Sequence, residues 1–136
     1  MTRLCGLLVA VTVVLLLGAC SAMQVRESGM TNAPLRAPEK RLLTGIRQYE
    51  DGDLKQAQES LQAALAGGLS YDVDKVAAHK YLAFILGASG RERECREQFA
   101  AALALDPKLE LTRAEAGHPA WGPVFKSVKA TVAPSR

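Results

Sequence analysis

The chain contains few of the residues that carry catalysis or bind metal ions. Its 136 residues include two histidines, three cysteines and one tryptophan. His79 and His118 have no second histidine or pair of carboxylates at ligand spacing, whereas a zinc site needs about four well-placed donors. The sequence contains no glycine-rich phosphate loop and no nucleophile elbow. It therefore predicts no enzyme, no cofactor, no metal site and no small-molecule substrate.

The chain also lacks a strong excess of charge of one sign. Lys and Arg total 17 and Asp and Glu total 14, which gives a net charge of +3. The densest charged stretch, residues 91–97, alternates in sign and places Glu92 four residues before Arg96, a spacing typical of an exposed helix surface. A nucleic-acid site needs a basic patch or stripe. We therefore expect no nucleic-acid partner.

Apolar residues are concentrated near the N-terminus. Residues 4–17 carry no charge and follow Arg3. This run fits the apolar region of a secretory signal peptide and is too short for a permanent membrane span of about 20 residues. The small residues Gly18 and Ala19 then precede Cys20.

The segment Leu17-Gly18-Ala19-Cys20 resembles the lipobox of bacterial lipoproteins. The resemblance implies that residues 1–19 are a cleaved signal peptide and that the Cys20 sulfur carries a lipid. Several acyl chains, each contributing about 0.8 kcal/mol per buried methylene, make attachment to a membrane effectively permanent. Ser21, rather than Asp, implies transfer to the outer membrane, facing the periplasm. An ordinary secretory signal or an uncleaved anchor is the alternative.

Residues 20–38 have no apolar periodicity. They contain Ser, Gly, Thr, Asn and two prolines, a composition that favours a flexible linker. The part after Cys20 would span at most about 60 Å when stretched. The linker would let a folded domain move away from the membrane surface.

A repeated pattern begins at Glu39. Two segments align with a constant offset of 38 residues, and each predicts a helix, a glycine-containing turn and a second helix. Gly52 and Gly90 are expected in the left-handed conformation that ends many helices. The aligned pairs are Gly45 with Ala83, Gly52 with Gly90, Ala57 with Cys95, Leu61 with Phe99, Ala64 with Ala102, and Leu65 with Leu103.

Residues 39–107 resemble the tetratricopeptide repeat in this pattern of small and large apolar positions. The resemblance implies an all-α fold with two helix–turn–helix repeats. The family period is 34 residues, so the extra residues are expected within 66–74. Arg41 and His79 stand where the family has a bulky aromatic residue, and Cys95 replaces a small alanine. We interpret Cys95 as a small buried hydrophobic residue.

Two repeats are too few to bury a continuous core without a cover. Residues 108–136 are therefore predicted to form a capping segment. Two prolines flank Trp121, and Val124, Phe125 and Val128 follow with the spacing of one apolar helix face. Lys126 and Lys129 are expected outside this face. The alternative is that Trp121 forms an exposed docking patch.

The tetratricopeptide resemblance also implies a partner-binding groove lined by the first helix of each repeat. Carrying the family spacing onto this chain places six residues there, with Trp121 as the alternative site. They are Leu42, Ile46, Tyr49, Lys80, Phe84 and Gly87. We expect Lys80 to make no essential contact within the fold. Phe84 and Tyr81 could instead pack inside the domain, and the sequence leaves this open.

The lipobox, the two repeats and the segments 79–99 and 114–125 together resemble small accessory lipoproteins associated with bacterial type VI secretion. This resemblance implies a lipid-anchored adaptor that binds a protein component of the secretion system in the cell envelope. The alternative is a pilotin-like or peptidoglycan-associated structural lipoprotein of another envelope assembly.

The lipobox generates the first prediction. Cys20→Ala removes the only sulfur at this site that could accept the lipid, so the variant should accumulate as unprocessed precursor. Metabolic labelling with a radioactive fatty acid should mark the wild-type protein and leave the variant unlabelled. Cys5→Ala is the matched control and should remain labelled. Labelling of Cys20→Ala would exclude this anchor.

Overall fold

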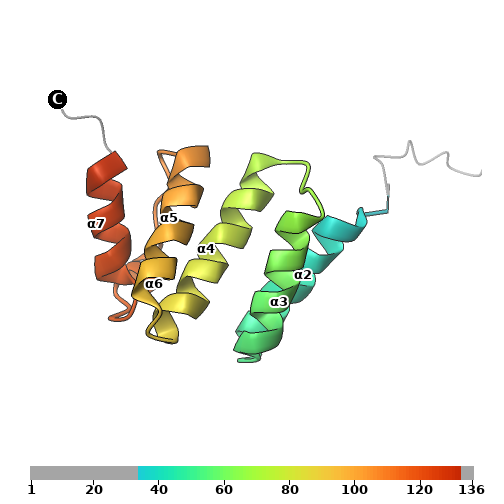
Figure 1. Cartoon of the computed structure of the whole chain (residues 1–136), viewed down its shortest axis with the longest axis horizontal. Helices are drawn as coiled ribbons and strands as arrows, with labels where there is room; N and C mark the ends of the chain where they lie inside the picture. Colours follow the sequence, from blue (N-terminus) through green and yellow to red (C-terminus); the bar gives the residue numbers. More distant parts are fainter. Residues whose placement is uncertain (1–33, 133–136) are drawn as a thin grey trace, which may run out of the picture. The chain divides into compact units, whose positions relative to one another are not determined.

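A computed structural model describes residues 34–132, which contain helices and no strands (Figure 1). This confirms the all-α prediction. The predicted signal peptide, Cys20 and the linker as far as residue 33 lie outside the described residues. The helices are α2 (Ala37–Glu50), α3 (Leu54–Ala66), α4 (Asp72–Ala88), α5 (Glu92–Leu105), α6 (Arg113–Ala116) and α7 (Gly122–Val132).

The helices pack as consecutive hairpins. α2 packs against α3 and α4 against α5, while α3 contacts α4 and α5 contacts α7. The long helices therefore stand in a row in chain order, with α2 and α3 at one end and α7 at the other (Figure 1). The short helix α6 lies in the connection between α5 and α7.

The two hairpins turn in the same way, 38 residues apart. Gly52 and Gly90 have φ angles of +86° and +72°, as expected for the left-handed conformation. The Asp53 N–H donates to the Gln48 carbonyl at 2.8 Å, and the Arg91 N–H donates to the Leu86 carbonyl at 2.9 Å. These bonds satisfy carbonyl groups that a helix end would otherwise leave without partners.

Small residues allow the two helices of each hairpin to approach closely. A Cβ atom at Gly45 would lie 2.8 Å from Leu61 Cγ. Ala57 and Cys95, which align between the repeats, are both fully buried. Burial, with a smaller contribution from Glu92, raises the pKa of the Cys95 thiol to about 11. The thiol therefore stays protonated at neutral pH, which agrees with its interpretation as a small hydrophobic residue.

The folded region begins earlier than the sequence suggested. α2 starts at Ala37, so Pro38 belongs to the first helical turn and the boundary of the predicted linker at residue 38 is wrong. Proline suits this position because the first turn leaves its backbone N–H groups without partners inside the helix. Pro38 and Glu39 are buried, and the Glu39 carboxylate accepts a hydrogen bond from the Ser70 N–H at 3.1 Å. The start of α2 is thus attached to the loop between α3 and α4.

Candidate partner-binding surfaces

The face formed by α2 and α4 is largely filled by side chains of this chain. Leu42 and Phe84 were expected to line a groove there, but they are only 4% and 1% exposed. Ile46 and Tyr49 are half-buried and pack against the same core. The expectation that Leu42 and Phe84 meet a partner is therefore wrong, because the fold covers both.

A connected series of aromatic rings covers Phe84. The Trp121 ring stacks on Phe84 with a centroid distance of 4.8 Å and an angle of 26° between the rings. Phe84 also contacts Tyr81 and Tyr49, with centroid distances of 5.9 and 6.2 Å. His118 stacks on the far side of the series, 3.4 Å from the Trp121 centroid. The series thus runs from α2 through α4 to the segment before α7.

Trp121 covers α4 and is only 6% exposed. Its indole Nε1–H donates to the Glu115 carbonyl at 2.9 Å. A Cβ atom at Gly87 would lie 3.1 Å from Trp121 Cβ, so a small residue is needed for this approach. These contacts favour the capping interpretation of Trp121 over the exposed docking patch.

Lys80 is also engaged within the fold. Its Nζ lies 2.8 Å from Glu115 Oε1, and the two side chains are 20% and 21% exposed. The same Nζ lies over the Tyr81 and Phe84 rings, at 5.2 and 5.6 Å from their centroids. The expectation that Lys80 makes no essential contact within the fold is therefore wrong.

Glu115 reaches Lys80 from α6, a helix that sequence analysis missed. The Glu115 N–H donates to Thr112 Oγ1 and the Thr112 N–H donates to Glu115 Oε2, a capping box that fixes the start of α6. The Thr-x-x-Glu spacing was the available signal. Burial alone would raise the pKa of Glu115, but the hydrogen bonds from Lys80 and Thr112 outweigh it and lower the pKa. The carboxylate is therefore ionised at neutral pH.

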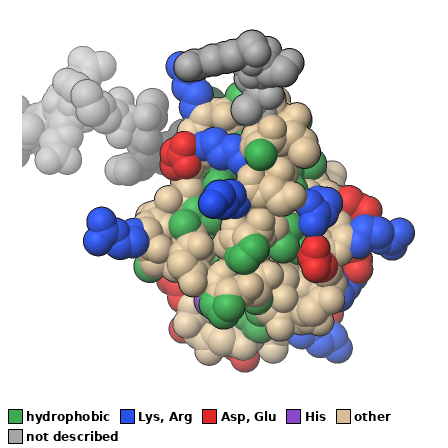
Figure 2. Space-filling view, turned by 90° about the vertical axis from the view of Figure 1, so that its left-hand side faces the viewer, with side chains coloured by type: hydrophobic (Ala, Val, Ile, Leu, Met, Phe, Trp, Pro, Cys, Tyr) green, Lys and Arg blue, Asp and Glu red, His purple; other side chains and the backbone are tan. Residues whose placement is uncertain are grey.

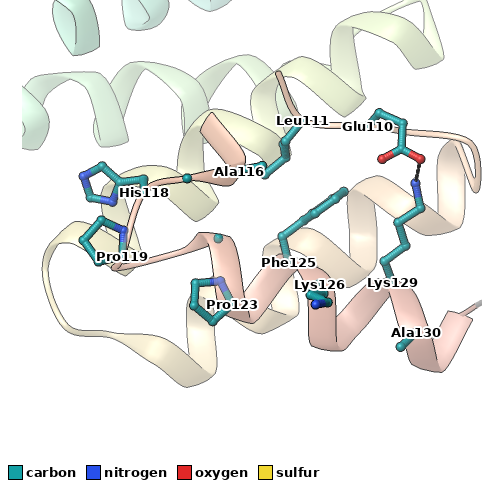
Figure 3. A pocket seen from close by; sticks show the side chains of 12 residues that line it. Glu110, Leu111, Ala116, His118, Pro119, Pro123, Phe125, Lys126, Lys129 and Ala130 are labelled. Carbon is teal, nitrogen blue, oxygen red and sulfur yellow. Dashed lines mark hydrogen bonds and ion pairs between the residues drawn. The ribbon is translucent and has the colours of Figure 1, made fainter. Parts of the chain in front are cut away.

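A second surface is formed by the connection after α5 together with α7. A groove of about 710 Å³ runs between residues 110–119 and α7 (Figure 3). Its side walls and floor are mainly apolar. The apolar lining residues are Leu111, Ala116, Pro119, Pro123, Phe125 and Ala130.

Lysine side chains stand at the edge of this groove. The Lys129 Nζ donates to the Leu109 carbonyl at 2.7 Å and pairs with the Glu110 carboxylate. Lys126 is exposed and forms no ion pair within residues 34–132. The end of the domain seen in Figure 2 shows apolar side chains among lysines, arginines and acidic side chains. Sequence analysis placed Lys126 and Lys129 on the outer side of α7 but did not predict the groove beside them.

Within residues 34–132, no group of three or more His, Cys, Asp or Glu side chains is arranged to hold a metal ion. No helix in the same region is long and apolar enough to cross a membrane.

No family model, curated protein or solved structure matches the chain. Its function must therefore be argued from its own residues and their arrangement.

The contact between Lys80 and Glu115 generates the second prediction. Lys80→Glu should lower the free energy of unfolding by about 2 kcal/mol, because it removes a hydrogen bond between charged groups and places two carboxylates together. Urea denaturation at pH 7 measures this change. Lys108→Glu is the matched control, since Lys108 is exposed and forms no ion pair in the described region. The double variant Lys80→Glu/Glu115→Lys should recover part of the loss, and equal stability of Lys80→Glu and wild type would contradict the prediction.

The lowered pKa of Glu115 generates the third prediction. Because the folded-state pKa lies below the ordinary value of 4.5, the stabilisation by Glu115 is present above about pH 4.5 and is lost as the pH falls through the folded-state pKa. The difference in unfolding free energy between wild type and Glu115→Gln should therefore be largest near pH 7 and shrink towards pH 3. Urea denaturation across this range measures it. A difference independent of pH would refute the role of the ionised carboxylate.

Proposed function

We propose that the protein is a lipid-anchored adaptor of the bacterial cell envelope. Acyl chains on Cys20 would hold it at the outer membrane, and the helical domain would bind a protein partner in the periplasm. The residues that support the anchor are the apolar run 4–17 and the lipobox ending at Cys20. The family resemblance favours a component of a type VI secretion system as the partner.

The observation that carries the binding function is the open apolar groove beside α7. Exposed apolar surface bordered by polar residues marks interaction sites, and this groove of about 710 Å³ has a mainly apolar lining. The face between α2 and α4 is occupied by Trp121 and by the pair of Lys80 and Glu115. A partner would therefore find its apolar contact area at the C-terminal end of the domain.

Helical hairpins are well suited to an adaptor. Stacked hairpins give a stiff scaffold whose outer surfaces can hold two other molecules at a defined separation. The aromatic series between α2, α4 and Trp121 makes residues 37–132 one connected core.

Crosslinking in intact cells tests the proposed function and is the fourth prediction. Cells producing an affinity-tagged protein at natural levels are treated with a reversible crosslinker, and the purified products are identified by mass spectrometry. The wild-type protein should enrich a membrane or sheath component of a type VI secretion system. Cys20→Ala should lose most of this enrichment, because it carries no lipid and is not transferred to the outer membrane.

The same measurement separates the alternative. Enrichment of a secretin or of peptidoglycan fragments would support a pilotin-like or wall-associated lipoprotein and would contradict the secretion-system role. Equal enrichment by Cys20→Ala would show that the lipid on Cys20 is not needed for the interaction.

A further inference from the structure

We propose that the groove between residues 110–119 and α7 binds an apolar segment of a partner protein that carries an acidic side chain, and that Lys126 pairs with this carboxylate. The proposal rests on the proposed function as an adaptor and specifies the chemistry of its partner.

The two walls of the groove are held together at both ends. At one end, the Gly122 N–H donates to the His118 carbonyl at 2.9 Å, and a Cβ atom at Gly122 would collide with the Ala116 carbonyl. At the other end, Lys129 of α7 bonds to the Leu109 carbonyl and to Glu110. Figure 3 shows the second connection as the dashed contact between Glu110 and Lys129. The groove is therefore formed before any ligand arrives, which reduces the entropy lost on binding.

The floor is also fixed by the core. Phe125 contacts the buried Phe99 ring with a centroid distance of 5.1 Å, and it is only 5% exposed. Leu111 and Ala116 face it from the opposite wall (Figure 3). Because Phe125 itself is buried, a ligand would meet the accessible apolar side chains of the groove, which favours aliphatic or aromatic ligand groups. These side chains are Leu111, Ala116, Pro123 and Ala130.

The charge at the groove favours an acidic partner. Glu110 is the acidic residue among the lining side chains, and it is already paired with Lys129. Lys126 lines the same groove, is exposed and has no ion pair within residues 34–132. The charge left for a ligand is therefore positive. A carboxylate beside the apolar segment would complement it, whereas a lysine there would be repelled.

The same charge disfavours a second copy of this chain as the occupant. A two-fold contact places the same surface of each copy against the other. It would bring Lys126 of one copy towards Lys126 of the next without a free carboxylate in the groove to separate them. We therefore assign the groove to a different protein.

Peptide binding tests the proposal with the detergent-solubilised full-length protein. The probes are two fluorescent ten-residue peptides that share leucine and phenylalanine positions and differ only in carrying two glutamates or two lysines. Fluorescence anisotropy should show at least a tenfold preference for the glutamate peptide. Lys126→Glu should lower the affinity for the glutamate peptide at least tenfold and raise the affinity for the lysine peptide. Ala130→Trp should fill the groove and lower the affinity for both peptides.

Lys55→Glu is the matched control, because Lys55 is an exposed lysine on α3 with no ion pair in the described region. It should bind the glutamate peptide like the wild type. Thermal melts check that the variants stay folded, which is expected because Lys126 and Ala130 are exposed.

Three results would overturn the proposal. They are equal affinity of both peptides, unchanged binding by Lys126→Glu, and self-association of the wild type that Ala130→Trp abolishes in sedimentation experiments. The last result would assign the groove to a second copy. If Ala130→Trp still crosslinks to the wild-type partner in cells, the partner binds elsewhere on the domain and the groove proposal fails. The adaptor function would stand in that case, so the two proposals can fail independently.

Discussion

The stacking of Trp121 on Phe84 is the contact on which the rest of the domain depends. Two hairpins alone would leave the aromatic face of α4 open, and stacked repeats need a cover at their ends. Trp121 provides it and joins a series of rings that reaches Tyr49 on α2 and, through Phe99, Phe125 on α7. Aromatic pairs contribute about 0.5 to 1.5 kcal/mol beyond the burial of their area. The C-terminal segment is therefore part of the core.

This cover changes where a partner can bind. Residues that a tetratricopeptide groove would present, such as Phe84, are buried, and the charge of Lys80 is neutralised by Glu115. A ligand on that face would have to displace an aromatic contact and a partly buried ion pair. On the other side of the same segment, α7 has α5 as its main neighbour, and its outer face borders the groove. Residues 110–121 thus cover the face between α2 and α4 and also form one wall of the groove beside α7.

The position of the groove fits the proposed adaptor. α7 lies at the end of the row of helices away from α2, where the chain enters the domain (Figure 1). The proposed anchor at Cys20 precedes α2 in the chain. A partner held at α7 would therefore be separated from the start of the folded region by the width of both hairpins, and Lys126 would be free to select it by charge.

The sequence by itself determined the features that depend on neighbours along the chain. The 38-residue register, the left-handed Gly52 and Gly90, and the apolar face of α7 all follow from local spacing and backbone geometry, and the structure has each of them. The lipid anchor stays a prediction, because Cys20 lies outside the described residues. Only the tertiary structure decided that Glu115 meets Lys80, 35 residues away, and that a groove forms beside Phe125. Those contacts depend on the path of the connection between α5 and α7. This connection is irregular, so no periodic pattern in the sequence indicates its direction in space.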